Sequence, residues 1–161
     1  MSESLAEKVI QKIGEVALLY HRLLLVVAPA GSGKTIALQN VHEGSAAPLI
    51  NVNLELSRRM LDLTERQRTL QLPRLLSEII EATESDLILL DNIEILFDIE
   101  LKQDPLRLLQ GLSRNRTLVA TWSGFIKGGH LFYASPEHPE YRRYSIHDLQ
   151  VVYPDVIDEE K

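Results

Sequence analysis

The residues best suited to chemistry lie at positions 28–35, which read Ala-Pro-Ala-Gly-Ser-Gly-Lys-Thr. Gly31 and Gly33 allow backbone turns in which successive amide groups point inward at an anion. Lys34 offers a positive charge to phosphate oxygens, and the hydroxyl of Thr35 is a magnesium ligand. The residues predicted to bind a phosphate-bearing cofactor are Pro29, Ala30, Gly31, Ser32, Gly33, Lys34 and Thr35.

The surroundings of these residues also fit a phosphate-binding loop (Walker A). An apolar segment precedes the loop and a helical pattern begins at Lys34, so the positive end of the helix dipole faces the same point as the loop amides. Ala28 stands where the first glycine of the pattern is usual. The alternative is a plain strand-to-helix turn with an unrelated lysine, which the combination of residues and context disfavours. ATP and Mg²⁺ are therefore the predicted cofactors.

A phosphate-binding loop needs an acidic residue on a neighbouring strand to position magnesium. The segment 87–91 reads Leu-Ile-Leu-Leu-Asp, an apolar run that ends in aspartate. We therefore predict that Asp91 and Thr35 are the metal ligands. The alternative for Asp91 is a strand-end aspartate that caps the next turn.

Hydrolysis also requires a group that orients the attacking water. Many ATPases place a glutamate directly after the magnesium aspartate, but this chain has Asn92 there, and Glu94 is the next candidate for a base. Thr121 or Ser123, at the end of another predicted strand, would sense the terminal phosphate. The alternatives are a solvated turn acid and ordinary strand-end hydroxyls. The predicted catalytic residues are Lys34, Asp91, Glu94, Thr121 and Ser123.

The elements that must position these residues follow from hydrophobic periodicity and from helix-capping signals. Strands are expected at 23–27, 49–54, 87–91, 117–122 and 131–134. Helices are expected at 5–20, after a capping box of Ser4 and Glu7, at 34–41 with an end near Gly44, across 57–84 with a break at Pro73, and from Pro105 to about Gly111 after a cap at Asp104.

Strands that alternate with helices predict an α/β fold, in which a mainly parallel five-stranded sheet lies between helices. The segment 124–144, with adjacent glycines and several prolines, is expected to be the least regular part. Residues 1–153 are expected to form a single domain. Residues 154–161 are expected to be a disordered acidic tail.

Composition narrows the class of protein further. A chain of 161 residues suits one domain, and its net charge of −6 argues against a molecule that is basic overall and wraps nucleic acid. With no cysteine, disulfides and thiolate metal sites are excluded. The longest apolar run, residues 23–30, is far shorter than the roughly 20 residues of a membrane span. We expect a soluble, cytoplasmic protein with no membrane contact.

With Lys34, Asp91 and Thr121 or Ser123 in this order, the chain resembles the core of AAA-type ATPases. More closely, it resembles the BrxF family, the small phosphate-loop proteins of type III BREX phage-defence systems. That resemblance covers residues 5–153 and rests on residues 28–35, 87–94, 121–124 and 133–144. It implies a P-loop NTPase core of the AAA-like (ASCE) type, with an extra strand between the loop strand and the Asp91 strand. It also implies a nucleotide-binding subunit of an antiphage complex, beside larger ATPase, methyltransferase and phosphatase-like partners on DNA.

The chain departs from the AAA pattern in two places. It ends about where a helical lid domain should begin, so no lid arginine can be assigned, and residues 123–130 are too few for the usual helix before an arginine finger. The site is then expected to be completed by oligomerisation. The candidate cations that would act on a neighbouring subunit are Lys127, Arg114, Arg116, Arg142 and Arg143, each of which could equally be a solvated surface charge.

Five of the eleven arginines fall between positions 58 and 74, where only Asp62 and Glu65 oppose them. Arginine suits phosphate recognition, so this segment is a candidate DNA contact. The slightly favoured alternative is a solvated helix face with Glu-to-Arg pairs. The residues concerned are Arg58, Arg59, Arg66, Arg68 and Arg74.

The sequence leaves three functions open. The leading hypothesis is an ATP-binding and slowly ATP-hydrolysing regulatory or assembly subunit of a BREX complex. The second is a nucleotide-dependent scaffold without turnover, favoured by Asn92. The third is a small-molecule kinase, in which Arg107, Arg114 and Arg116 would clamp a phosphoryl acceptor.

Overall fold

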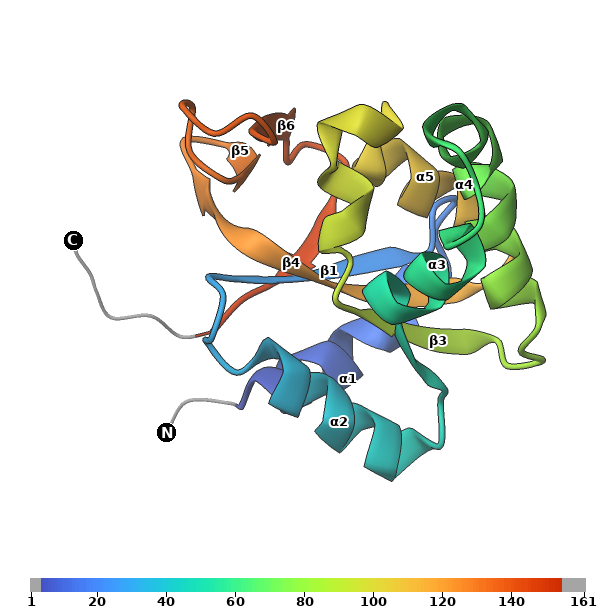
Figure 1. Ribbon diagram of the computed structural model, residues 1–161. Helices are drawn as coiled ribbons and strands as arrows, with labels where there is room; N and C mark the ends of the chain where they lie inside the picture. Colours follow the sequence, from blue (N-terminus) through green and yellow to red (C-terminus); the bar gives the residue numbers. More distant parts are fainter. Residues whose placement is uncertain (1–3, 155–161) are drawn as a thin grey trace.

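The computed structural model describes residues 4–154 as an α/β fold with a mainly parallel sheet between two layers of helices (Figure 1). The helices are α1 (Leu5–Val16), α2 (Lys34–Ser45), α3 (Val52–Met60), α4 (Glu65–Glu81) and α5 (Pro105–Leu112), with 3-10 turns η1 (Glu94–Phe97) and η2 (Ile99–Leu101). The strands are β1 (Leu23–Ala28), β2 (Leu49–Asn51), β3 (Leu87–Asp91), β4 (Thr117–Lys127), β5 (His130–Tyr133), β6 (Arg142–Ser145) and β7 (Gln150–Val152). The predicted fold class is thus confirmed at the level of a mostly parallel α/β sheet.

The parallel part of the sheet has the order β2-β3-β4-β1-β7. The strand between β1 and β3 is therefore β4, while β2, which lies between them in sequence, is at the edge. β7 completes the parallel part, where the sequence suggested 131–134 as the fifth strand. Those residues form β5, which pairs antiparallel with β4.

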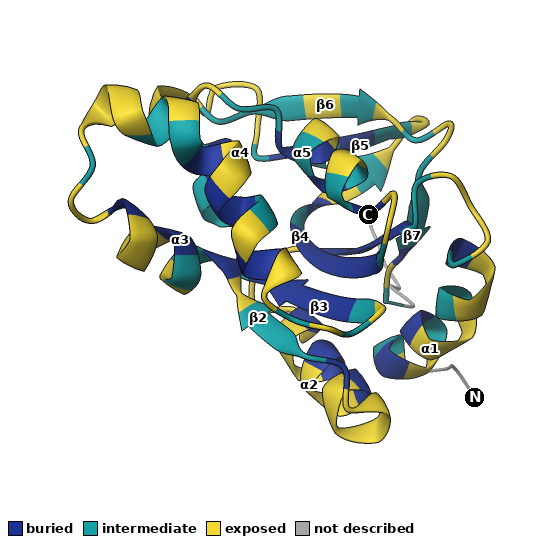
Figure 2. Ribbon diagram, turned by 90° about the vertical axis from the view of Figure 1, so that its right-hand side faces the viewer, coloured by how far each residue is buried: buried dark blue, intermediate teal, exposed yellow. Residues whose placement is uncertain are grey.

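The central strands are buried on both faces, as their continuous apolar sequences require (Figure 2). Alternate residues of β1 divide between two cores. Leu23, Leu25 and Val27 pack in the larger core with α3, α4 and α5, whereas Leu24 and Val26 pack with α1 and α2. Trp122 on β4 is fully buried in the larger core.

Helix α1 begins as predicted, because the Ser4 side chain accepts from the Glu7 amide while the Glu7 side chain accepts from the Ser4 amide. It ends at Val16 and not at residue 20. Helix α2 continues past Gly44 and ends at Ser45, followed by the C-cap Ala46, whose φ is +61°. The predicted start of α5, with Asp104 as cap and Pro105 in the first turn, is confirmed, and Gly111 lies inside that helix.

The predicted strand 49–54 is wrong beyond Asn51. The Asn51 side chain accepts from the Leu54 amide and so caps α3, which takes in Val52 to Leu54. The break between α3 and α4 lies at residues 61–64, where Thr64 forms a second capping box, and not at Pro73. Proline at 73 deprives the carbonyl of Thr69 of its helical donor. The Gln103 side chain donates to that carbonyl at 2.9 Å, which explains why α4 continues through Pro73.

The segment 124–144 is more regular than expected. β4 extends to Lys127, turns at Gly128 and Gly129, whose φ values are +57° and +78°, and returns as β5. Two adjacent glycines with positive φ form a tight two-residue turn. β6 then pairs with β5, so a three-stranded antiparallel unit rises from the end of β4 (Figure 1).

Two expectations concern the molecule as a whole. No helix among residues 4–154 is both long and apolar enough to cross a membrane. The predicted acidic tail falls outside the described residues, apart from Pro154.

Candidate functional site

The predicted phosphate-binding residues form an exposed loop between the end of β1 and the first residue of α2. Gly31 and Gly33 have φ values of +79° and +90°, conformations that suit glycine, so both glycines are needed for the path of the loop. Gly33 caps α2 without any side-chain hydrogen bond. The first amides of α2 are therefore not capped by a side chain, and an anion could accept from them.

Lys34 is folded back under the loop. Its Nζ donates to the carbonyl oxygens of Ala28 and Pro29, both at 2.9 Å, and the residue is only 6% exposed. Burial lowers the pKa of Lys34, while the nearby charges of Glu94 and then Asp91 act in the opposite direction. An ammonium has three donors, so one remains for a ligand after these two bonds.

Asp91 is buried at the carboxyl end of β3, opposite Asn51 of β2. Its Oδ1 accepts from the Thr121 hydroxyl at 2.8 Å and from the Asn92 amide at 2.9 Å. Both bonds fall on one oxygen, so Oδ2 remains for a ligand. Thr121 is 1% exposed and serves to hold Asp91, which leaves Ser123 as the more accessible of the two predicted sensor hydroxyls.

Glu94 is half-buried at the start of η1. Its Oε2 accepts from the Ser123 hydroxyl at 3.2 Å, and its Oε1 accepts from the Asn53 side-chain amide at 3.4 Å. The predicted base and the predicted sensor are thus in direct contact. In the parallel pairing of β1 with β4, Ala28 lies beside Ser123. The phosphate loop therefore begins next to Ser123 and Glu94.

The sequence reasoning missed Asn53. Its side-chain Oδ1 accepts from the Ile95 backbone amide at 2.8 Å, and its backbone amide donates to the Asn92 carbonyl at 2.8 Å, so it fixes the turn that carries Glu94. Asn92 itself has a φ of +54°. The only signal in the sequence was a polar residue within the apolar run 49–54, and the expected strand gave it no role.

The five predicted catalytic residues and the phosphate loop therefore gather where β1 and β3 end. On β4, Thr121 and Ser123 lie midway along the strand, where its parallel pairing with β1 ends. The oxygen donors fit magnesium, a hard cation that takes carboxylate and hydroxyl ligands. Thr35 is exposed at the start of α2, and Asp91 has one oxygen without a hydrogen bond. Among residues 4–154 there is no cluster of three or more His, Asp or Glu side chains that could hold a metal. A magnesium ion here would take its remaining ligands from phosphate oxygens and water.

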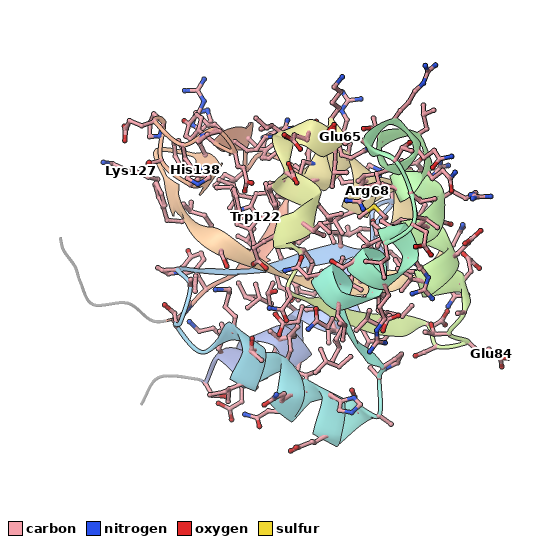
Figure 3. The ribbon with its side chains drawn as sticks, viewed as in Figure 1. Glu65, Arg68, Glu84, Trp122, Lys127 and His138 are labelled. Carbon is pink, nitrogen blue, oxygen red and sulfur yellow. The ribbon has the colours of Figure 1, made fainter. Side chains whose placement is uncertain are left out.

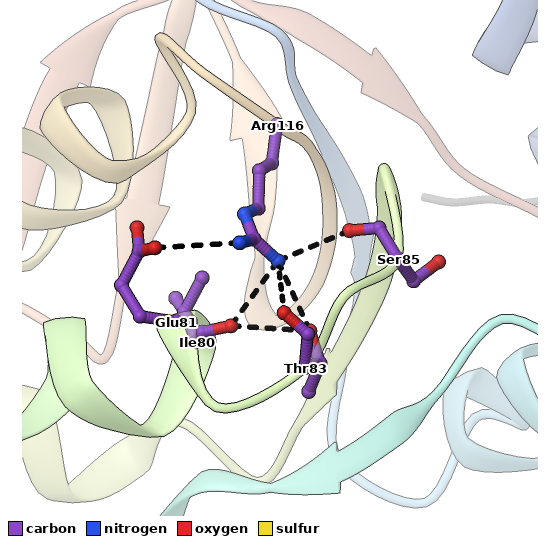
Figure 4. A network of polar contacts seen from close by, with 5 residues as sticks. All are labelled: Ile80, Glu81, Thr83, Ser85 and Arg116. Atoms are coloured by element: carbon purple, nitrogen blue, oxygen red, sulfur yellow. Dashed lines mark hydrogen bonds and ion pairs between the residues drawn. The ribbon is translucent and has the colours of Figure 1, made fainter.

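The candidate cations that would act on a neighbouring subunit differ in how many contacts they already make within this chain. Arg116 donates to the carbonyls of Ile80, Thr83 and Ser85 and pairs with Glu81, which holds it at the end of α4 (Figure 4). Arg142 donates to the Gln103 carbonyl, and Arg114 stacks on the Tyr20 ring at 4.8 Å.

Two candidates remain. The side chains of Lys127 and Arg143 have no hydrogen bond or ion pair with any part of the chain that the structure describes. Lys127 projects from the outer end of the β4–β5 turn (Figure 3).

The arginines proposed for a kinase do not gather at the site. Arg114 and Arg116 precede β4 and so lie at the amino ends of the strands, whereas Lys34 and Asp91 lie at the carboxyl ends. Arg107 is on α5, 86% exposed, and pairs with Asp104. The expected acceptor clamp is thus absent from this arrangement.

The arginine-rich segment is largely paired within itself. Arg58 and Arg59 both contact Glu55, and Arg74 contacts Glu78 and Gln71. Arg68, in the first turn of α4, is labelled in Figure 3. It donates to the carbonyls of Leu63 and Leu61, which lie in the turn before that helix. These are the Glu-to-Arg pairs and local caps of the slightly favoured alternative. Contact of this segment with DNA stays a prediction.

Comparison with known proteins gives little beyond this geometry. No protein-family model matches the chain, and no curated protein does. Among solved structures, one similar chain is PCH-2 of C. elegans, with a TM-score of 0.46 and 13% sequence identity. That alignment covers 94% of this chain and 43% of PCH-2, so this chain spans less than half the length of that protein.

Proposed function

We propose that this protein is a P-loop NTPase that binds ATP with Mg²⁺ and hydrolyses it slowly. The observation that carries the proposal is the meeting of Lys34, Asp91, Glu94 and Ser123 beside a glycine loop that opens directly into α2. In such a site the loop amides and Lys34 bind the phosphates. Magnesium, held by Thr35 and Asp91, would neutralise charge on the phosphate oxygens.

The roles of the remaining residues follow from their contacts. Thr121 keeps the Asp91 carboxylate oriented, and Asn53 fixes the turn on which Glu94 sits. Glu94 accepts the proton of the attacking water, and Ser123, bonded to Glu94, positions that carboxylate. The hydrogen bond between them links Ser123, the predicted sensor of the terminal phosphate, to the predicted base Glu94, as expected of a nucleotide-dependent switch.

The test is steady-state phosphate release from ATP and Mg²⁺ over a range of protein concentrations. We expect Lys34→Ala to abolish release because the loop then lacks its charge, while Lys12→Ala, a surface lysine on α1, leaves release unchanged. A specific activity that rises with protein concentration would support a site completed by a neighbouring subunit.

Equal release by wild type and Lys34→Ala would contradict the proposed enzyme. If neither protein releases phosphate but wild type still binds ATP with Mg²⁺, the scaffold alternative is favoured. Release that rises only with a small-molecule acceptor would favour a kinase.

We further propose, on the resemblance to the BrxF family, that the protein serves as a regulatory or assembly subunit of a BREX antiphage complex in the cytoplasm. The loop residues and Thr35 are exposed, so a bound nucleotide would be only partly enclosed and a second copy or a larger BREX protein would cover it. Of the five candidate cations, Lys127 and Arg143 are the two whose side chains have no hydrogen bond or ion pair within residues 4–154, so they would act on that neighbour.

Mass measurement with and without ATP tests the assembly. Lys127→Ala and Arg143→Ala should lower turnover without lowering ATP affinity if either residue acts on a neighbouring subunit.

A DNA contact through the arginine-rich segment is tested by removing charge at Arg58 and Arg66. If the wild-type protein binds DNA and the variant binds it equally well, this contact is contradicted.

A further inference from the structure

An apolar pocket of about 400 Å³ adjoins the phosphate loop, and the site described above does not use it. Its walls come from the end of β1, the first loop residue Pro29, the extension of β4 and the residues after β7. The lining residues are Val27, Ala28, Pro29, Gly124, Phe125, Ile126, Tyr153 and Pro154. This volume is within the range of roughly 300–1,000 Å³ that is usual for small-molecule sites.

Two aromatic rings border this pocket and are unusually accessible. Phe125 is 46% exposed and Tyr153 is 52% exposed, whereas Phe97, Trp122 and Tyr133 are buried in the larger core. Phe125 stacks on Phe132 with centroids 4.9 Å apart and an interplanar angle of 14°, which fixes the orientation of its ring. The Lys8 ammonium donates to the Tyr153 carbonyl at 2.9 Å and so ties this segment to α1.

The sheet also leaves backbone groups open at this place. β4 pairs with β1 only as far as Ser123, because β1 ends at Ala28 and the chain turns into the phosphate loop. From Gly124 onward β4 pairs with β5 on its other side, and no described strand continues the ladder on the side that β1 has left. An open strand edge presents unpaired N–H and C=O groups.

Aromatic faces, an open backbone edge and a neighbouring phosphate loop match the parts of a purine nucleotide. Nucleobases stack on aromatic side chains, and their edges carry adjacent hydrogen-bond donors and acceptors. We infer that the purine base of the nucleotide held by the phosphate loop lies in this pocket, against Phe125 and Tyr153, with its polar edge toward residues 124–126 of β4. This inference rests on the proposed nucleotide binding and names the group that selects the nucleotide.

Calorimetric titration with ATP, UTP and inorganic tripolyphosphate, all with Mg²⁺, tests the inference. Base stacking contributes about 1–3 kcal/mol per base, a factor of about 5 to 150 in affinity. Wild type should therefore bind ATP at least about fivefold more tightly than tripolyphosphate, and more tightly than UTP. Tyr153→Ala should weaken ATP binding by about tenfold and leave tripolyphosphate binding unchanged, whereas Tyr153→Phe should retain the wild-type affinity.

The controls separate this inference from the proposed function. Tyr20→Ala removes an exposed tyrosine that does not border the pocket and should change neither affinity, whereas Lys34→Ala should weaken both. Melting temperatures of the variants confirm that each one folds. Phe125→Leu, which keeps an apolar contact with Phe132, provides a second test of stacking.

Three results would overturn the inference. ATP affinity that is unchanged in both Tyr153→Ala and Phe125→Leu, but lost in Lys34→Ala, would place the base elsewhere and leave the proposed function intact. Equal weakening of ATP and tripolyphosphate by Tyr153→Ala would show that the pocket only supports the loop. If wild type binds neither ATP nor tripolyphosphate, the inference and the proposed function both fall.

Discussion

Asp91, the last residue of β3, and Glu94, three residues further on, have different surroundings. At the scale of single residues this difference favours different roles for the two carboxylates. Asp91 is 7% exposed and accepts two hydrogen bonds on one oxygen. Glu94 is half-buried, accepts longer bonds from Ser123 and Asn53, and is the carboxylate whose charge most affects the pKa of Lys34. A rigid, buried carboxylate suits a metal ligand, whereas a less constrained one near the lysine suits a base.

Glu94→Gln is the substitution that separates binding from turnover. The amide keeps the size of the side chain but cannot accept a proton, so phosphate release should fall by about 10²–10⁴-fold while ATP affinity changes little. Single-turnover release and equilibrium binding on the same preparation measure the two effects. Wild-type turnover in Glu94→Gln would show that another group orients the water.

At the scale of elements, β4 connects the parts of the site. Its first half lies between β1 and β3 and carries Thr121, and its second half turns out of the parallel sheet to form the antiparallel unit. The change of partner happens at Gly124, where a Cβ would lie 1.9 Å from the Phe132 carbonyl oxygen. β4 can therefore approach β5 this closely only with glycine at this position.

Gly124→Ala should lower the free energy of unfolding by at least about 2 kcal/mol, because the obstacle is backbone and the strands must separate. The matched control is Gly14→Ala in α1, where nothing lies within 4 Å of the added carbon. That change should stabilise the protein by about 0.5–1 kcal/mol. Urea unfolding of the two variants measures both effects, and similar stabilities would mean that the hairpin accommodates the methyl group.

Arg116 closes the carboxyl end of α4 and joins it to the strand that follows. Arg116→Ala should destabilise the protein by about 2 kcal/mol, because three carbonyls lose a charged donor. Arg116→Lys should recover only part of this, since an ammonium lacks the planar fork. Arg107→Ala, 86% exposed, is the control and should cost little in thermal unfolding. An Arg116→Ala variant with full stability but no turnover would contradict this structural role and favour Arg116 as a cation that acts on a neighbouring subunit.

At the scale of the whole molecule, the antiparallel unit is attached to the larger core by a cluster of aromatic side chains. Phe97 stacks on Tyr133 at 3.6 Å between centroids, and Trp122 contacts both Tyr133 and Tyr144 edge-on. The Tyr144 hydroxyl donates to Asp104 at 2.9 Å, at the start of α5. Burial raises the pKa of Tyr133 to about 12, and burial together with the bond to Asp104 raises the pKa of Tyr144.

These tyrosines make stability depend on alkaline pH. An unfolded tyrosine loses its proton near pH 10, so between about pH 10 and 12 the unfolded state binds fewer protons than the folded state. The free energy of unfolding should therefore fall as pH rises through this window, by up to about 1.4 kcal/mol per pH unit for each group. Below pH 10.5 the lowered pKa of Lys34 acts in the opposite direction, since there the unfolded state binds more protons.

Denaturant unfolding at pH 8, 10 and 11 measures this slope. Tyr144→Phe should be less stable than wild type at pH 8, because the bond to Asp104 is lost, but its stability should fall less steeply above pH 10. Parallel curves for the two proteins would contradict the assigned role of Tyr144.

The local sequence pattern was sufficient to predict the parts of the structure that depend on residues close to one another in the chain. The loop 28–35, the buried strands β1 and β3 and the capping box of Ser4 and Glu7 depend on residues within a few positions of one another, so sequence spacing predicted them. The gathering of Lys34, Asp91, Glu94, Thr121 and Ser123 also followed, because parallel strands bring their carboxyl ends to one edge of the sheet.

Only the tertiary structure decided the features that depend on distant partners. Gln103 lets α4 continue past Pro73, the carbonyls around Ile80 engage Arg116, and Asn53 anchors the turn of Glu94, in each case across more than thirty positions of sequence. The open edge of β4 arises where β1 ends and β5 pairs on the other side. Each of these hydrogen bonds forms only because the folded chain brings two distant segments together. A local pattern of residues does not specify which distant segments will meet.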